Sequence, residues 1–412
     1  MTRHASTGAG TAVIAGAGIG GLAAALTLRE AGVETILVEQ RTALGETGAG
    51  IQLSPNASNV LFALGLGPAL MRHAVEPQRV RVRALAGGAE LARMELGQAM
   101  RDRYGAPYLV IARNDLHMVM LDALRGGPGA RILTGRTVTA AHTRGERAVV
   151  TAARGNGQEE ELAGDFAIGA DGVWSRLRRA LGAAPPRYRG YHAWRAVIPA
   201  GALPAGLDVA ETGLWLGSGR HLVHYGVNAG RSVNVVAVIP AREALPAWSH
   251  EADPQTVRDA FRDAHPQART LVASAGEWRI HALHDAPPPA RWSSGRVTLL
   301  GDAAHPVLPF LAQGGALAIE DAATLASLVG EAMRAGMPLP RALEMYAAAR
   351  RARAARVQRE GRRNGWIYHL PPPLSLARNL VMRRMGGDGV LARHDWLYGW
   401  RPPQIAAARR TG

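Results

Sequence analysis

The chain has 412 residues, of which 47% are hydrophobic and 20% are charged, an ordinary composition for a globular protein of one large or two moderate domains. It contains no cysteine, which excludes disulfides, thiolate nucleophiles, cysteine-ligated zinc and iron–sulfur clusters. No apolar run reaches the roughly 20 residues that cross a bilayer, and residues 1–10 lack the apolar core of a secretory signal. We therefore expect a cytoplasmic protein without a membrane partner.

The formal net charge is +15, and arginine alone supplies the positive charge, because all 48 basic residues are arginine and the sequence has no lysine. This indicates a compositional bias rather than a surface built for nucleic acid. The densest cluster, residues 350–363, is predicted as one helix with arginines spread around it and no interleaved aromatic residues for base stacking. We interpret it as a solvated helix face rather than a polyanion site, and we expect no nucleic-acid partner.

The first part of the chain alternates strands and helices. Residues 11–16 (TAVIAG) predict a short buried strand, 20–31 a helix rich in alanine and leucine, and 33–40 (VETILVEQ) a second strand. The same order of strand, turn and helix returns at 108–124 and at 165–181. This alternation predicts a parallel sheet with helices packed against it, so the expected fold class is α/β.

The middle of the chain has a different pattern. Residues 79–85 alternate arginine with apolar side chains, as a half-exposed antiparallel strand does, and 191–239 include a hairpin of 221–227 and 232–239. Residues 297–302 (VTLLGD) return to the α/β pattern, and the tail from 316 is mostly helical, with a break at 369–375. We expect an antiparallel sheet inserted into the α/β domain. The expected parts are 10–78, 104–185 and 279–330 for the α/β domain, 79–103 and 186–278 for the inserted sheet, and 331–412 for a helical C-terminal region.

The clearest motif is a glycine loop between the first strand and the first helix. Gly16, Gly18 and Gly21 have the G-x-G-x-x-G spacing, in which the glycines permit a tight turn, close approach of a pyrophosphate, and close packing of helix on strand. Glu39 ends the next strand, where an acid suits hydrogen bonds to the ribose hydroxyls of an adenosine. The motif therefore predicts a dinucleotide site, which by itself fits NAD or FAD.

Two further loops place an aspartate at the end of a strand, Asp171 in GADGVWSRLR and Asp302 in GDAAHPVLPFLAQGG, and an NAD domain needs neither. Together with the glycine loop, GAGIQLSPNA, RNDLHMVML and a final WLYGW, they span nearly the whole chain. With these segments the chain resembles the FAD-dependent aromatic hydroxylases, the single-component flavin monooxygenases, closest to the salicylate hydroxylase-like branch. The resemblance implies a Rossmann-like FAD domain of the glutathione-reductase type, an inserted substrate sheet and a helical C-terminal region.

The resemblance also implies how the cofactor is held. Asp302 is expected to hydrogen-bond the ribityl or pyrophosphate part of a non-covalent FAD, and the helix from 316 to point its N-terminus at the isoalloxazine, where its dipole stabilises negative charge. No second glycine motif follows a strand, so NADH or NADPH is expected to dock transiently. The remaining expected cofactor contacts are Gln52, Arg113, Asp171, Gly314 and Gly315.

The substrate is expected over the flavin, against the strand 221–227. Strand alternation puts His221 and Tyr225 on one face, and the resemblance supports both, with Gln313, as substrate contacts. A histidine satisfied within the sheet, a packed tyrosine and a helix-capping glutamine are the simpler structural alternatives. No arginine is clearly aimed as a carboxylate clamp, which leaves a hydroxybenzoate and a neutral or larger phenol open.

The activity implied by the resemblance is hydroxylation of an aromatic substrate with NAD(P)H and O2, through a flavin C4a-hydroperoxide. A His–Tyr pair would assist by withdrawing the phenolic proton. Two alternatives stay open: an enzyme of the same fold that oxidises or reduces a non-aromatic or larger natural-product substrate, and a non-catalytic flavin-fold binding protein. No metal site is expected, and the protein is expected to be a monomer or a homodimer.

Overall fold

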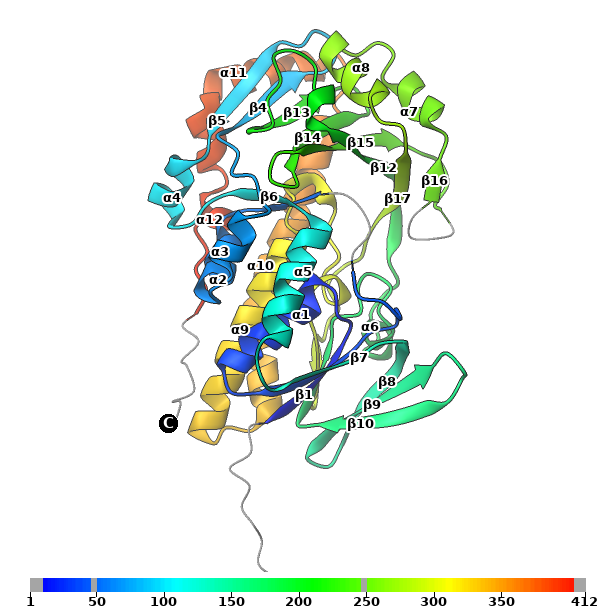
Figure 1. Cartoon of the computed structure of the whole chain (residues 1–412), viewed down its shortest axis with the longest axis vertical. Helices are drawn as coiled ribbons and strands as arrows, with labels where there is room; N and C mark the ends of the chain where they lie inside the picture. Colours follow the sequence, from blue (N-terminus) through cyan, green and yellow to red (C-terminus); the bar gives the residue numbers. More distant parts are fainter. Residues whose placement is uncertain (1–9, 46–49, 246–249, 404–412) are drawn as a thin grey trace, which may run out of the picture.

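The structure is a computed structural model that describes residues 10–45, 50–245 and 250–403. Residues 48 and 49 of the GAGIQLSPNA segment, and nearly all of the segment at 1–10, lie outside it. Figure 1 shows an α/β body at one end of the molecule and a broad sheet at the other, with the long helix α10 running between them. None of the described helices is long and apolar enough to cross a membrane.

The α/β body is built on a six-stranded sheet in the order β18-β19-β11-β1-β2-β7. All neighbouring strands are parallel except the β18–β19 pair. The prediction of a parallel sheet is therefore confirmed. Its central strands are short and buried, as strands covered on both faces must be. The strands of the sheet are β1 (Thr11–Ala15), β2 (Glu34–Val38), β7 (Ala130–Leu133), β11 (Phe166–Gly169), β18 (Ser293–Ser294) and β19 (Val297–Leu299).

Helices cover one face of this sheet and a three-stranded antiparallel sheet lies against the other (Figure 1). The alanines of α1 let it pack closely on α9, since small side chains bring helix axes together. The helices of this layer are α1 (Ile19–Glu30), α5 (Arg113–Arg125), α9 (Gly314–Ala335) and α10 (Leu339–Tyr368). The small sheet holds β8 (Arg136–Arg144), β9 (Arg147–Arg154) and β10 (Glu159–Gly164).

The inserted sheet has eight strands in the order β16-β17-β12-β15-β14-β13-β4-β5. The predicted hairpin is confirmed as β14 and β15, and 79–85 forms β4 in the same sheet. One pair, β4 with β13, is parallel, because the chain crosses the α/β body between them. The strands are β4 (Arg79–Ala84), β5 (Glu90–Glu95), β12 (Arg187–Pro199), β13 (Glu211–Leu216), β14 (His221–Val227), β15 (Ser232–Pro240), β16 (His250–Ala252) and β17 (Trp278–Asp285).

A two-stranded sheet lies where the two bodies meet. The strand predicted at 108–124 does not join the parallel sheet: β6 (Leu109–Ala112) pairs antiparallel with β3 (Gly50–Leu53). An apolar run predicts a buried strand but carries no information about its partner. The other helices are α2 (Pro55–Ala63), α3 (Gly67–Met71), α4 (Gln98–Tyr104), α6 (Arg176–Ala180), α7 (Pro254–Ala260), α8 (Pro266–Ala273), α11 (Leu374–Ala392) and α12 (Asp395–Tyr398), with short 3₁₀ turns at Ala200–Ala202, Gly301–Ala303 and Pro309–Leu311.

Two expectations about arginines are wrong. Arg350 is 2% exposed, so the 350–363 segment does not present all its arginines to solvent. Arg83, in the strand predicted to be half-exposed, is also buried and forms an ion pair with Glu211 at 2.8 Å. In both cases a carboxylate from another element neutralises the arginine, and sequence periodicity gives no sign of such a partner.

Candidate active site

The glycine loop forms the turn that its spacing predicts. Gly16 has φ +102°, and a Cβ there would lie 2.5 Å from the carbonyl oxygen of Ala170. A Cβ at Gly21 would lie 2.0 Å from the carbonyl oxygen of Gly16, so only glycine lets α1 approach the end of β1. Gly18 is the N-cap of α1 and no side chain caps the helix, which leaves its first N–H groups open to a phosphate.

Two of the predicted acids lie beside this loop. Glu39 accepts a hydrogen bond from the backbone N–H of Ala17 at 2.9 Å, which ties the end of β2 to the glycine loop. Asp171 follows β11, next to Gly16, and accepts from the backbone N–H of Arg176. Its second carboxylate oxygen is buried without a partner among the described residues, and burial raises the pKa of the carboxyl. The loop after β11, next to the glycine loop, therefore carries a carboxylate oxygen that can accept a hydrogen bond from a ligand.

Asp302 lies in the turn between β19 and the loop that leads to α9. Burial raises the pKa of its carboxyl, although the nearby charges of His305 and Arg113 act in the opposite direction. A Cβ at Gly314 would lie 3.9 Å from an oxygen of Asp302, so this acid stands at the N-terminus of α9. The N-cap residue of α9 makes no side-chain hydrogen bond to the first turn of the helix. The arrangement leaves a carboxylate and a positive helix end facing the same space.

The other predicted cofactor residues lie between the α/β body and the large sheet. Gln52, on β3, accepts a hydrogen bond from the hydroxyl of Tyr108. A Cβ at Gly315 would lie 2.6 Å from the side chain of Ile51, so β3 packs directly on the start of α9. Arg113 begins α5, and its charge acts on Asp302 and on groups of the large sheet.

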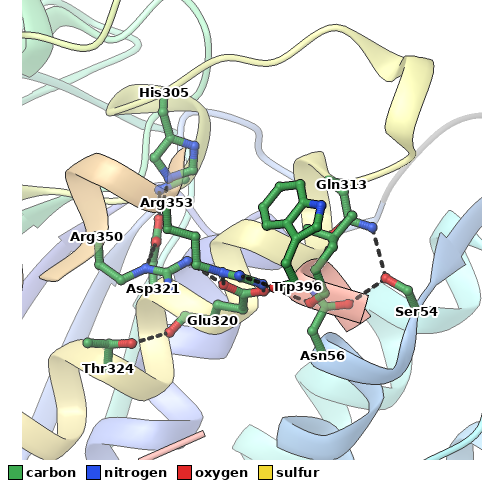
Figure 2. A network of polar contacts seen from close by, with 12 residues as sticks. Ser54, Asn56, His305, Gln313, Glu320, Asp321, Thr324, Arg350, Arg353 and Trp396 are labelled. Atoms are coloured by element: carbon green, nitrogen blue, oxygen red, sulfur yellow. Dashed lines mark hydrogen bonds and ion pairs between the residues drawn. The ribbon is translucent and has the colours of Figure 1, made fainter. Parts of the chain in front are cut away.

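A buried polar network lies beside the turn that carries Asp302 (Figure 2). Asp321 is fully buried on α9. Its carboxylate accepts hydrogen bonds from Arg350 at 2.6 Å and from the backbone N–H of Gly301 at 3.0 Å. It also lies 2.5 Å from Nε2 of the His305 ring. Burial acts to raise its pKa, but His305 and Arg350 outweigh this and lower it to about 2. The charged carboxylate therefore fixes the turn that carries Asp302.

Glu320, the neighbour of Asp321, connects the network to the C-terminal region. It accepts from Arg350 and Arg353 of α10, each at 2.6 Å, and from the amide of Asn56 at 2.6 Å. Arg353 also donates to the backbone carbonyls of Trp396 and Leu397 at 2.9 Å. The network in Figure 2 therefore ties α2, α9, α10 and α12 together.

The carboxamide of Gln313 is held within this network rather than open. Its oxygen accepts from Asn56 at 3.0 Å, and its nitrogen donates to the Ser54 hydroxyl at 2.9 Å and to the Leu311 carbonyl at 3.3 Å. The side chain is 1% exposed, and the residue is the N-cap of α9 without a side-chain cap bond. In this geometry Gln313 fixes the loop before α9.

The large sheet turns one face toward the α/β body, with His221 and Tyr225 on it. Strand alternation is as predicted: Val223 and Tyr225 pack in one apolar cluster, and Leu222 in a cluster on the opposite face. His221 and Tyr225 are four positions apart on β14, roughly 13 Å between Cα atoms, so they form no pair with each other. His221 contacts His369 and Phe310, whereas Tyr225 lies against Gly50 of β3.

The sequence reasoning missed an arginine on this same face. Arg195 of β12 is opposite Val236, which is itself opposite Val223, so Arg195 lies between His221 and Tyr225 in register. Its Nε is buried, and the side chain has no hydrogen bond or ion pair with the described residues. Burial lowers its pKa, and the charge of Arg113 acts in the same direction. A lone charged residue inside the apolar run YHAWRAVI was the available signal.

These features fit a bound FAD. The two uncapped helix ends and the glycines suit a pyrophosphate and an isoalloxazine, Glu39 suits a ribose, Asp171 supplies an unused acceptor, and Asp302 places a carboxylate at the start of α9. FAD, when bound, supplies hydride acceptance from NAD(P)H and activation of oxygen. Within the described part of the chain, no group of three or more histidines, aspartates and glutamates is placed to hold a metal ion.

Comparison with known proteins decides the family. Residues 10–361 match the family model described as "FAD binding domain". The chain is 33% identical over 398 residues to a 3-hydroxybenzoate 6-hydroxylase of Klebsiella oxytoca, covering 97% of this chain and 98% of that protein. The chain belongs to the FAD-dependent aromatic hydroxylases. The expected cofactor and reaction class are thereby confirmed.

Solved structures share the fold of this chain. One is Klebsiella pneumoniae HpxO complexed with FAD and uric acid, with a TM-score of 0.81 and 27% identity, covering 94% of this chain and 96% of the other. Another is a salicylate hydroxylase substrate complex, with a TM-score of 0.80 and 25% identity, covering 97% of this chain and 100% of the other. The salicylate hydroxylase-like fold is therefore confirmed.

Proposed function

We propose that this hydroxylase acts on a hydroxybenzoate, a ring that carries both a phenolic hydroxyl and a carboxylate. The observation that carries the proposal is Arg195, whose Nε is buried and whose guanidinium has no anionic partner among the described residues. A half-buried arginine without a counter-ion is unfavourable, and a bound carboxylate would offset that cost with two parallel hydrogen bonds. The relatives named for 3-hydroxybenzoate and salicylate support this substrate class.

The spacing on the sheet supports the same substrate. Arg195 lies two strands and two residues away from both His221 and Tyr225, which is roughly 12 Å between Cα atoms. All three side chains project from the same face of the sheet, so they border the same space. A hydroxybenzoate fits between them, with its carboxylate at Arg195 and its hydroxyl toward His221. Tyr225 would then hold the ring from the other side, and Gln313 would position the loop before α9.

The substrate class is tested with matched rings. We expect 3-hydroxybenzoate or salicylate to accelerate NADH or NADPH oxidation, consume O2 and give a dihydroxylated product. The neutral analogue 3-hydroxybenzyl alcohol should bind at least tenfold more weakly, because one charge-assisted hydrogen bond contributes about 1.5–3 kcal/mol. Equal KM values for the acid and the alcohol would contradict the proposal.

Arg195→Met tests the clamp itself. We expect KM for the hydroxybenzoate to rise roughly ten- to hundredfold while that for the neutral alcohol stays unchanged. Arg187→Met is the matched control, because Arg187 lies on the same strand and is exposed. If Arg195→Met weakens acid and alcohol equally, or removes FAD, Arg195 serves the fold or the cofactor instead.

His221 and Tyr225 are proposed to act on the substrate and not on FAD. His221→Ala or Tyr225→Phe should lower product formed per NAD(P)H by about ten- to hundredfold, with FAD content unchanged. The missing NAD(P)H equivalents should appear as hydrogen peroxide, because oxygen is then activated without a prepared ring to receive it. Unchanged product yield and affinity in both variants would reduce this pair to sheet packing.

A further inference from the structure

Large apolar side chains are exposed together on one helix of the C-terminal region. Leu374, Leu376, Leu380 and Val381 of α11 are between 52% and 66% exposed, and Trp366, near the end of α10, is 65% exposed. A soluble protein normally exposes such residues singly, so a group of this size calls for an explanation. The other exposed large apolar residues of the described chain are scattered over it, namely Met71, Trp174, Val197 and Met333.

The exposed residues of α11 form a continuous stripe. Leu376, Ala377, Leu380, Val381 and Arg384 follow the i, i+1, i+4, i+5, i+8 spacing, which places them on one face of a helix. All five are exposed. We call this surface the α11 face. It joins an apolar stripe to a cation at the C-terminal end of the stripe.

The opposite side of α11 is packed, so the helix cannot turn to hide the stripe. Figure 1 shows α11 beside β5, at the edge of the large sheet. Met382 packs on the apolar cluster that includes Leu91 of β5. Arg378 is buried and donates to the carbonyl of Ile367 at 3.1 Å, which holds α11 to the end of α10 where Trp366 lies.

The charge around the α11 face has one sign. Between Glu360 and Asp388 the sequence has five arginines and no acid. Arg384 has no hydrogen bond or ion pair with the described residues, and Arg383 donates only to the backbone carbonyl of Glu90, at 3.4 Å. Two cationic side chains therefore stand beside the apolar stripe without a carboxylate partner in the described part of the chain.

A second copy of this chain would complement the α11 face poorly. A twofold contact sets the same patch against itself, so Arg383 and Arg384 would be desolvated against a surface that carries no acid. The surface of an anionic bilayer offers both complements, an apolar boundary for the leucines and phosphates for the guanidinium groups. Trp366 suits the same boundary, because its ring is apolar and its indole N–H is polar.

We propose that the α11 face docks on the surface of an anionic phospholipid bilayer, with Leu376, Leu380 and Val381 inserted below the headgroups and Arg383 and Arg384 at the phosphates. Such docking needs no spanning helix, and none of the described helices is long and apolar enough to span. The lack of a long apolar run in the sequence predicts that the chain does not cross a bilayer. The expectation of no membrane partner does not follow for a helix that lies on the surface.

Co-sedimentation of the FAD-loaded protein with vesicles tests the docking. We expect vesicles of phosphatidylcholine and phosphatidylglycerol in equal parts to bind it roughly tenfold or more tightly than vesicles of phosphatidylcholine alone, with release at high salt. Leu376→Ser combined with Leu380→Ser should weaken binding to the mixed vesicles roughly tenfold or more, with unchanged FAD content. Met71→Ser is the control, because Met71 is an exposed apolar residue on α3.

Two further measurements separate charge from insertion. Arg383→Gln combined with Arg384→Gln should reduce binding on mixed vesicles to the level seen with phosphatidylcholine alone, whereas Arg351→Gln, an exposed arginine on α10, should not. The chain has no cysteine, so Leu380→Cys gives a single labelling site. A polarity-sensitive fluorophore there should shift its emission to shorter wavelength on mixed vesicles, and the same fluorophore at Met71→Cys should not.

Three results would overturn the docking. The first is equal binding to both kinds of vesicle. The second is wild-type binding by either the double leucine or the double arginine variant, since other arginines would then hold the protein on the lipid. The third is a dimer, seen without vesicles, that the double leucine variant abolishes, because a second copy would then cover the α11 face.

Discussion

Gly21 shows how the absence of one side chain shapes the cofactor site. A Cβ there would lie 2.0 Å from the carbonyl oxygen of Gly16, which is backbone and cannot rotate away. A Cβ at Gly16 would likewise lie 2.5 Å from the carbonyl oxygen of Ala170. The three backbone segments are therefore in contact at the point where a pyrophosphate would bind, and a methyl group at either glycine must separate them.

We predict that Gly21→Ala lowers both FAD occupancy and stability. Overpacking of this kind costs about 1–3 kcal/mol, and the displaced loop no longer matches the pyrophosphate. The measurements are the ratio of flavin to protein after purification and the thermal midpoint without FAD. Gly201→Ala is the control, since a Cβ at Gly201 meets nothing within 4 Å. Full FAD occupancy in Gly21→Ala would show that the cofactor site is wrongly placed.

Helices α9 and α10 depend on each other through charge as well as apolar packing. Arg350 reaches from α10 to both Glu320 and Asp321 of α9, and all three are buried. We predict that Arg350→Met lowers the free energy of unfolding by about 3–5 kcal/mol, because it leaves buried carboxylates short of a partner. Urea unfolding measures this, with the exposed neighbour in Arg351→Met as control. A loss below 1 kcal/mol would mean that Arg353 and His305 suffice.

At the scale of the whole molecule, the buried network makes stability depend on acid pH. Folding lowers the pKa of Asp321 from 3.8 to about 2, so below pH 4 the unfolded chain binds this proton more readily than the folded one. The stabilising contribution is complete above pH 4 and is lost as the pH falls toward 2. We predict that the thermal midpoint of wild type falls more steeply over that window than that of Asp321→Asn. Parallel curves for both proteins would exclude Asp321 as a source of the dependence.

Much of the fold follows from local pattern, whereas less of the site does. The glycine loop, the strand-end acids and the hairpin of 221–227 and 232–239 were predicted from short segments because turn chemistry and strand alternation act over few residues. Arg350 was misinterpreted, since its partners Glu320 and Asp321 lie about 30 residues away on another helix. His369 gave no signal at all: it follows a helix and precedes a proline run, and only the folded chain brings it into contact with His221.

The sequence by itself determined the fold class, the FAD loop, the face of β14 that carries His221 and Tyr225, and the family resemblance. Each depends on residue spacing that the backbone period turns directly into geometry. Only the tertiary structure decided that Gln313 is held by Asn56 and Ser54, and that Arg195, on the same face as His221 and Tyr225, has no partner among the described residues. Burial and pairing of polar groups are set by contacts between distant segments, and the energy of a buried charge depends on those contacts rather than on its neighbours in sequence.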